Sequence, residues 1–303
     1  MSEEHVAAGS MKEPRFGFVV LHYLVDDATI HCVDSIRREC ADHDVRIVVV
    51  DNNSANGSYE RLVAKYGDVP GVTLMHNESN EGFARGNNAG YRMCRDHFDC
   101  DYIVTINNDA MVANADFIPD CVADYERTGC GVIGPDIVSL KDNRHQNPSY
   151  GIIDTHEEVE RQTKRFKRIL AMEKAHVYGP LTSIKAALKG GSKGTPNPYT
   201  HDTAEPEEGR PYKLHGACLI FTPAYVAKFG EAFDPGTFLY FEENILAARC
   251  KEAGLSMLYD LRIRVEHMED ASTDSVKQNR REKQIFVLTN YLQSLRVLDK
   301  YVK

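Results

Sequence analysis

Short apolar runs alternate with segments of helical periodicity over the first 140 residues of this 303-residue chain. The apolar runs are rich in β-branched and aromatic residues and fall at 16–24, 46–50, 72–76, 102–106 and 132–138. Apolar residues at helical spacing lie between them, at 28–40, 58–66 and 83–95. This order predicts an α/β fold in which a mostly parallel central sheet is flanked by helices.

A change of composition after residue 140 divides the chain into segments. Residues 141–212 carry many charges, several prolines and a Gly-rich patch, which is typical of an insertion. Apolar order returns in 213–270, where strands are expected at 214–221, 256–259 and 263–267 and a helix at 244–253. Residues 271–303 are expected to form one or two amphipathic C-terminal helices. The predicted organisation is therefore 14–140, 141–212, 213–270 and 271–303.

Charge and cysteine usage exclude some classes of protein. The formal charge of -9 argues against a general nucleic-acid binder, because phosphate neutralisation needs a broad surface of Lys and Arg. The eight cysteines are scattered, without a Cys-x-x-Cys pair. The first dozen residues are polar, and no run of eighteen apolar residues occurs. We therefore expect a cytoplasmic protein with reduced thiols, neither secreted nor membrane-spanning.

Polar clusters follow three of the expected strands. These clusters are His22 and Tyr23, residues 51–54 (Asp-Asn-Asn-Ser), and residues 107–109 (Asn-Asn-Asp). Ligands of open α/β sheets lie outside the carboxyl ends of the strands, and a carboxylate there can hold a hard cation against phosphate oxygens. The clusters together indicate a nucleotide diphosphate site. Taken alone, residues 51–54 also fit a turn or a helix N-cap.

Residues 80–90 carry glycines at positions 82, 86 and 90, inside a segment of helical pattern. Glycine is costly in a helix interior, so something is expected to approach this backbone closely. The spacing differs from Gly-x-Gly-x-x-Gly, which argues against a dinucleotide-binding dehydrogenase.

The order of these clusters resembles the family 2 glycosyltransferases with the GT-A fold, in particular the rhamnosyltransferase-like bacterial branch. The resemblance spans most of the chain and rests on residues 48–54, 80–90, 106–109, 216–220, 233–234 and 240–243, with Arg249 and His267. It implies a nucleotide-sugar-binding half at 14–140 and an acceptor-binding and catalytic half at 213–270.

The resemblance also implies individual roles. Glu243 would be the catalytic general base, and Asp109, His267 and Asn107 would hold a divalent metal, Mn²⁺ or Mg²⁺. The donor-binding residues would be His22, Tyr23, Asp51, Asn53, Asn80, Gly82, Phe83, Asn87, Asn107 and Asn108. The acceptor-binding residues would be Gly216, Ala217, Tyr240 and Glu242. On local grounds, residues 107–109 also fit a loop cap, His267 a surface or core histidine, and Glu242 and Glu243 an acidic helix N-terminus.

This sequence departs from the family pattern at three positions. Asn107 replaces the usual first carboxylate of the metal motif, Ile245 stands at a later acidic position, and Thr289 stands where the family often has an Arg before Asn290.

The implied reaction is inverting transfer of a sugar from a UDP- or dTDP-sugar to a hydroxyl of a glycan or lipid-linked glycan, in the synthesis of cell-surface polysaccharide. One alternative is a sugar-1-phosphate nucleotidyltransferase, although residues 22–27 lack the glycines of its phosphate loop. Another is a non-catalytic protein that binds nucleotide sugars or glycans.

The segment 161–193 is strongly basic, with nine Lys or Arg residues against the single acid Glu173. Apolar residues are interleaved with the charges, which favours peripheral contact with an anionic membrane at the inner face of the cell. A solvated flap over the acceptor cleft, or a surface for homo-oligomer formation, is the alternative.

Overall fold

The computed structural model describes residues 13–176, 200–269 and 279–303. Within these residues, eight strands form one mixed sheet in the order β3-β2-β1-β4-β7-β6-β8-β5. The strands are β1 (Phe16–His22), β2 (Val45–Asp51), β3 (Val72–His76), β4 (Tyr102–Asn107), β5 (Ala110–Val112), β6 (Val132–Ser139), β7 (Cys218–Phe221) and β8 (Met257–His267). The predicted α/β class is confirmed.

Parallel pairing in the first half of the sheet positions the loops that matter for function. Strands β3, β2, β1 and β4 run in parallel, so that their carboxyl ends lie at one edge. Strand β7 is antiparallel to both β4 and β6, and the short β5 is antiparallel to β8. Strands from 14–140 and from 213–270 therefore share one sheet.

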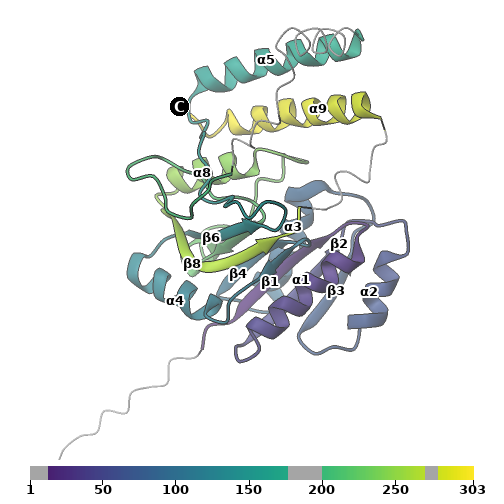
Figure 1. Ribbon diagram of the computed structural model, residues 1–303, viewed down its shortest axis with the longest axis vertical. Helices are drawn as coiled ribbons and strands as arrows, with labels where there is room; N and C mark the ends of the chain where they lie inside the picture. The colour runs from purple at the N-terminus through teal and green to yellow at the C-terminus, as the bar shows by residue number, and fades with distance from the viewer. Residues whose placement is uncertain (1–12, 177–199, 270–278) are drawn as a thin grey trace, which may run out of the picture.

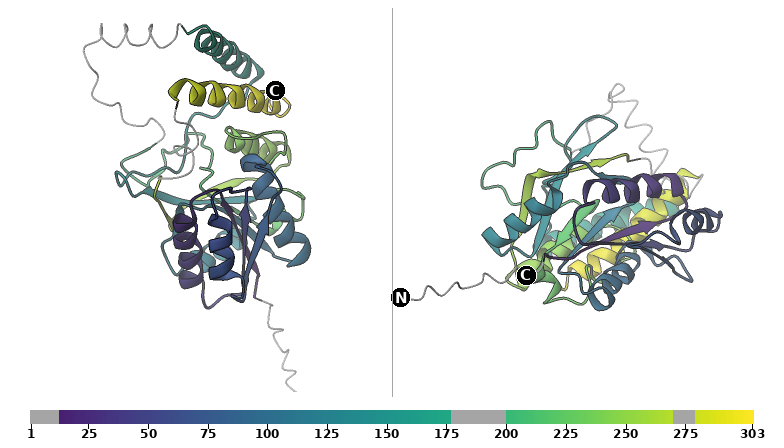
Figure 2. Two further views of the ribbon diagram at one scale, coloured as in Figure 1. Left: turned by 90° about the vertical axis from the view of Figure 1, so that its right-hand side faces the viewer. Right: turned by 90° about the horizontal axis from the view of Figure 1, so that it is seen from below.

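Helices cover both faces of this sheet (Figures 1 and 2). One face is covered by α1 (Asp26–Glu39), α2 (Ser58–Tyr66) and α4 (Phe117–Thr128). The other face is covered by α3 (Gly82–Arg92) with the π-helical turn η1 (Met93–His97), the short α7 (Pro223–Val226) and α8 (Glu242–Glu252).

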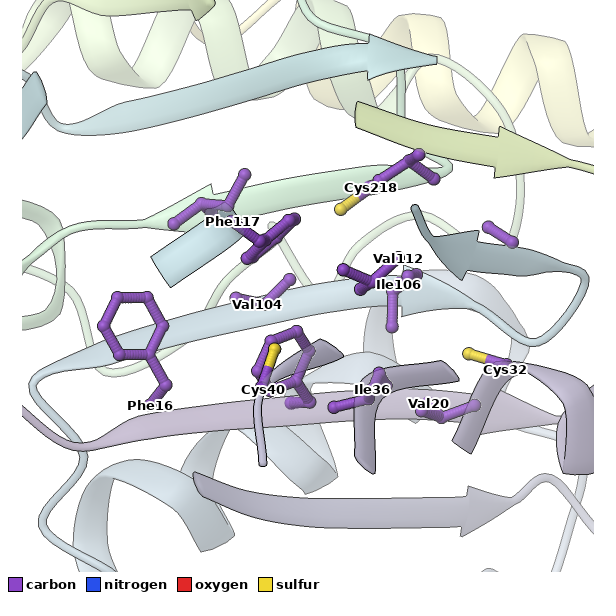
Figure 3. Close-up of a cluster of buried hydrophobic side chains, with 14 of the residues drawn as sticks. Phe16, Val20, Cys32, Ile36, Cys40, Val104, Ile106, Val112, Phe117 and Cys218 are labelled. Atoms are coloured by element: carbon purple, nitrogen blue, oxygen red, sulfur yellow. The ribbon is translucent and has the colours of Figure 1, made fainter. Parts of the chain in front are cut away.

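The core under α1 and α4 is made of fully buried apolar side chains, among them Phe16, Val20, Ile36 and Phe117 (Figure 3). Five cysteines pack into the same cluster, Cys32, Cys40, Cys121, Cys130 and Cys218, and Figure 3 labels the first two and the last. All eight cysteines are buried and free of disulfides, as the scattered spacing predicted. They act here as small apolar side chains.

A third layer lies above α8 (Figure 1). It consists of α5 (His156–Lys174) and α9 (Arg280–Leu298), which pack on each other over a small apolar cluster that includes Val159 and Leu295. None of the helices in the described part of the chain combines the length and the apolar character needed to cross a bilayer.

The structure differs from the sequence-based expectation in a few elements. The two strands expected at 256–259 and 263–267 form the single strand β8, because Arg262 bonds both Asp260 and Asp124 and holds the polar stretch in place. Strand β5 and helix α4 were not predicted. Strand β5 has only three residues, too few to show periodicity, and its place is set by pairing with β8.

Candidate functional site

The carboxyl ends of β1, β2 and β4 bring the three predicted polar clusters to one edge of the sheet. Their registers align His22 with Asp51 and Leu21 with Asn107. The clusters are therefore neighbours in space, although more than fifty residues separate the last two along the sequence.

Asp51 is fully buried, and its carboxylate is already engaged. One oxygen accepts a hydrogen bond from Nδ1 of His76 at 2.7 Å, and both accept the Ser54 amide at 3.2 Å. Nε2 of His22 lies 3.8 Å from the other oxygen. His76 itself has a side chain that is 40% exposed and a ring 5.0 Å from that of Tyr59. Asp51 therefore holds the imidazole of His76 at the surface.

His22 lies beneath the edge rather than in it. It is fully buried, and its two ring nitrogens contact the hydroxyls of Thr29 and Ser58 at 2.7 and 2.9 Å. Burial lowers its pKa, against the opposing charge of Asp51. Asn108 is also buried and donates to the Thr29 hydroxyl at 3.1 Å. In the structure these two side chains brace the loops that follow β1 and β4.

Asp109 and His267 meet at this edge across 158 residues of sequence. Ala110 pairs with His267 between β5 and β8, which places Oδ1 of Asp109 3.2 Å from Nε2 of His267. The Nδ1 of His267 contacts the side-chain oxygen Oε1 of Gln146 at 2.7 Å. The side-chain nitrogen Nε2 of Gln146 donates to the carboxylate of Glu269. His267 Nδ1 is therefore the donor in the bond to Gln146, and Nε2 faces the carboxylate of Asp109.

An imidazole nitrogen and a carboxylate oxygen 3.2 Å apart can share a proton or, once that proton is lost, bind a divalent metal together. A metal-bound histidine commonly donates its other N–H to a carbonyl, as His267 does to Gln146. Within the described part of the chain, no group of three or more His, Cys, Asp or Glu side chains is arranged to hold a metal. A metal on Asp109 and His267 would take its other ligands from Asn107, water and the diphosphate of a donor.

Glu243 lies against the turn that precedes β7. A Cβ added to Gly216 would be 2.9 Å from Oε1 of Glu243, so the carboxylate lies close against this glycine and would have to shift to make room for a side chain. The next residue, Ala217, accepts the backbone amide of Asn107 at 2.8 Å. The predicted base and the predicted metal loop are thus connected through Gly216 and Ala217.

Two residues with left-handed backbone introduce this glutamate. Tyr240 has φ 74° and Phe241 has φ 65°, a conformation that costs free energy in non-glycine residues and that is found at functional sites. The rings of both pack edge-on against Tyr291 of α9, at 4.9 and 5.2 Å. Packing on α9 thus holds the turn that aims Glu242 and Glu243.

Glu242 is buried, and among the described residues no partner reaches its Oε1. Burial, with the neighbouring charge of Glu243, raises the pKa of Glu242 to about 8. Glu242 is a neutral acid, whereas Glu243 lies nearer the surface and is the better candidate for a base.

The glycines of the segment 80–90 are approached closely by other parts of the protein, where the sequence did not distinguish a ligand from protein. Gly82, at φ 74°, lies against the carbonyl of Phe238, which accepts the Phe83 amide at 2.7 Å. Gly86 packs on Leu21, and Gly90 packs on Val19 and Val50. Close approach to this backbone is confirmed, and the approaching groups are other parts of the same fold.

The remaining predicted residues are spread along the same edge. Asn80 is exposed and accepts from the side chain of Asn52 at 3.0 Å, while Asn87 is buried and donates to the Phe83 carbonyl at 3.0 Å. Asn53 is exposed with φ 64°, and Tyr23 is half-buried. Asn80 and Asn53 are accessible to a donor, whereas Asn87 fastens α3.

Sequence reasoning missed three residues around this site: His76, Gln146 and His215. The ring of His215 lies 6.1 Å from that of His267, and its Nδ1 accepts the Ala217 amide at 3.1 Å. Burial lowers the pKa of His215 to about 4, although the charge of Glu243 opposes this. His215 could have been suspected, because it directly precedes the Gly216-Ala217 pair that the sequence singled out.

The fold and the edge cluster together define a GT-A type nucleotide-diphospho-sugar transferase fold. The sequence profile described as Glycosyl transferase family 2 matches residues 18–188, more than half of the chain. This chain belongs to that family.

Solved structures agree at the level of the fold. The crystal structure of GalNAc-T7 with UDP, GalNAc and Mn²⁺ is similar with a TM-score of 0.57 and 13% identity, over 96% of this chain and 55% of that one. The crystal structure of S. aureus TarS is similar with a TM-score of 0.51 and 11% identity, over 84% of this chain and 36% of that one. The chain thus spans between about a third and just over half of these structures. A search of curated proteins gave no match.

Proposed function

We propose that this protein is a metal-dependent, inverting glycosyltransferase of hexosyl or rhamnosyl type, which uses a UDP- or dTDP-sugar. The observation that carries the proposal is the convergence of Asp109, His267 and Glu243 around Gly216 and Ala217. The presence of UDP, GalNAc and Mn²⁺ in a structure of the same fold supports a nucleotide-sugar donor and a divalent metal.

In the proposed reaction, Glu243 accepts the proton of the acceptor hydroxyl. The acceptor oxygen forms a bond to the anomeric carbon, and the bond from that carbon to the diphosphate oxygen breaks, so that the diphosphate leaves with the electron pair. A divalent metal on Asp109 and His267, with Asn107, would neutralise the charge of the departing diphosphate. Positioning by the rigid sheet edge supplies much of the remaining rate enhancement.

Donor binding is proposed to use the accessible residues of the edge, namely Tyr23, Asn53, Asn80 and Asn107. Asp51 is proposed to act on the base through His76, because its own oxygens are already bonded. The buried His22, Asn87 and Asn108, with Gly82 and Phe83, are proposed to shape this site from behind.

The proposal is tested with Glu243→Gln and a nucleotide-sugar hydrolysis assay. We expect the variant to retain UDP or dTDP binding and to lose turnover by at least about 100-fold, the lower end of what a positioned general base contributes. A thermal-shift screen of UDP, dTDP and GDP with Mn²⁺ identifies the nucleobase of the donor. Near-full turnover in the variant would remove Glu243 from the role of base.

The same assay separates the two alternatives. A non-catalytic binder would bind the nucleotide sugar but release neither sugar nor nucleoside diphosphate. A nucleotidyltransferase would form a nucleotide sugar from a nucleoside triphosphate and a sugar 1-phosphate. Membership of the glycosyltransferase family favours glycosyl transfer over both alternatives.

We further propose that the acceptor is a glycan or lipid-linked glycan of a cell-surface polysaccharide, and that the protein works at the inner face of the membrane. The exposed side of α5 carries Lys164, Arg165, Lys167, Arg168 and Lys174. The apolar Phe166 packs instead toward α9, with its ring 5.0 Å from Tyr291. Any contact of α5 with lipid would therefore be electrostatic. Residues 177–193 of the basic segment lie outside the described residues.

A further inference from the structure

A pocket of about 670 Å³ lies between α9 and the turn that leads into α3. This volume is within the range of pockets that hold small ligands. Its walls are formed by Asn80, Glu81, Arg85, Pro235, Thr237, Phe238, Glu282, Ile285, Phe286, Thr289, Asn290 and Gln293. The six residues from α9 fall at helical spacing, so one face of that helix makes the upper wall.

The polar groups on the α9 wall present acceptors to the pocket. The amide nitrogen of Asn290 donates to the Phe286 carbonyl at 2.9 Å, and the hydroxyl of Thr289 donates to the Ile285 carbonyl at 2.7 Å. The amide nitrogen of Gln293 donates to the Gly236 carbonyl at 3.0 Å. These bonds use the hydroxyl proton of Thr289 and one of the two N–H groups of each amide, so the three side-chain oxygens and the second N–H of each amide remain for a ligand with hydroxyl groups.

The charges of the lining disfavour an anion. Glu81 and Glu282 provide two carboxylates, while Arg85 is the single cation among the lining residues. The Arg85 side chain donates to the Pro235 carbonyl at 2.9 Å and lies 3.6 Å from Glu81. A phosphate or carboxylate would therefore face uncompensated negative charge, whereas hydroxyls would find acceptors.

Two aromatic rings complete the surface. Phe238 and Phe286 lie edge to face, with ring centroids 6.1 Å apart. An apolar surface beside several hydrogen-bond acceptors suits a sugar ring, which has C–H faces and a rim of hydroxyls.

The pocket adjoins the loop that positions the catalytic glutamate. Thr237 is in its wall, and the hydroxyl of Thr237 contacts the buried carboxyl of Glu242. The same loop continues through Tyr240 to Glu243, and the ring of Tyr240 packs on α9. A ligand in this pocket would thus lie beside the loop that carries the proposed base.

We propose that this pocket binds a sugar unit of the acceptor, a hydroxyl-rich ring without anionic groups. The proposal rests on the proposed function of the site. It assigns α9 to recognition of the acceptor, with Thr289, Asn290 and Gln293 bonding sugar hydroxyls and Glu282 selecting against anionic sugars.

The test uses the full chain with UDP and MnCl₂ on an array of neutral, amino and anionic oligosaccharides. We expect the protein to bind neutral or amino members and to ignore those with phosphate or uronic acid. Thr289→Phe, at an exposed position of α9, should narrow the pocket and weaken this binding by at least about tenfold. Glu282→Lys should shift the preference toward anionic members, which a purely structural role of Glu282 would not produce.

Glu126→Lys is the matched control, because it makes the same change of charge at an exposed position of α4, outside the pocket lining. It should change neither the affinity nor the preference. Binding limited to anionic glycans, absence of glycan binding, or an unchanged profile in both pocket variants would overturn the proposal. UDP-dependent thermal stabilisation is measured on the same samples. Its absence in the wild type would count against the proposed function, whereas its presence without glycan binding would count against the pocket alone.

Discussion

At the scale of single residues, the pairing of Asp109 with His267 depends on the orientation of the imidazole. Gln146 bonds its Nδ1, and the carboxylate of Asp109 lies 3.2 Å from its Nε2. Neither side chain has a local sequence context that distinguishes it from a loop cap or a core histidine. The structural contact is what favours the metal role.

We therefore expect Asp109→Ala to abolish Mn²⁺-dependent binding of UDP or dTDP. Calorimetry with and without Mn²⁺ measures this effect. Asp42→Ala removes a carboxylate at an exposed turn and should leave the affinity unchanged. Equal metal-dependent affinity in Asp109→Ala and the wild type would refute the assignment.

Glu242 makes the stability of the protein depend on pH. Its folded-state pKa of about 8 lies above the ordinary value of 4.5, so the unfolded chain releases this proton at lower pH than the native protein does. The penalty for keeping the acid protonated is absent below about pH 4.5 and grows as pH rises toward 8. Native stability therefore falls over that window.

Glu242→Gln removes the titration and keeps a neutral side chain of similar shape. The variant should match the wild type near pH 4 and have a higher Tm at pH 8, when both are measured in EDTA by calorimetry. Glu126→Gln, at an exposed position, is the control and should follow the wild type at every pH. A constant difference across the range would contradict the role of Glu242.

At the scale of elements, α3 is fitted to the sheet by its glycines. A Cβ at Gly90 would lie 2.4 Å from Cγ1 of Val19 and 3.0 Å from Cγ2 of Val50. Asn88 fastens the same helix to the segment 213–270 by two hydrogen bonds of 2.9 Å with the backbone of Phe233. The segment 80–90 thus joins the two halves of the fold.

Gly90→Ala tests this role. Higher helix propensity would stabilise the variant by about 1 kcal/mol, but overpacking of a tight core costs about 1–3 kcal/mol. We expect a net loss of stability in urea denaturation and an unchanged affinity for UDP. A variant of equal or greater stability would show that the glycine serves something other than packing.

At the scale of the whole molecule, α5 and α9 form an outer layer above α8 (Figure 1). Their apolar sides pack on each other and on α8, which leaves a basic surface on α5. Arg161 and Lys164 have acidic partners within α5, Glu158 and Glu160, at 2.7 Å. The basic surface is therefore concentrated toward the C-terminal part of the helix.

Co-sedimentation with liposomes tests the proposed membrane contact. We expect binding to anionic but not to neutral vesicles, weakened by about 0.5 M salt because screening shortens the reach of exposed charges. Charge reversal at Lys164, Arg165, Lys167 and Arg168 should abolish binding to anionic vesicles. Glu126→Lys, a charge reversal on α4, is the control and should leave that binding intact. Equal recovery in the supernatant with both lipids would refute membrane contact and favour a flap or a self-association surface.

The sequence by itself determined the class of fold, and it predicted the strand ends at which the candidate site would lie. Apolar periodicity is a local property, and polar residues at strand ends must meet at one edge once the strands are parallel. Asp51, Asp109 and Glu243 could be singled out on this basis, together with the family resemblance.

Only the tertiary structure decided which of these residues lie together and which have their polar atoms occupied by hydrogen bonds within the protein. Asp109 contacts His267 because β5 pairs with β8, and that register depends on contacts between residues far apart in sequence. His22 and Asn87 match the expected residue types, but burial and hydrogen bonds with their neighbours occupy them. The pocket under α9 had no sequence signal, because its walls come from three separate parts of the chain. Long-range packing leaves no local pattern in the sequence. Packing nevertheless decides whether a polar side chain is free to bind a ligand or only supports its neighbours.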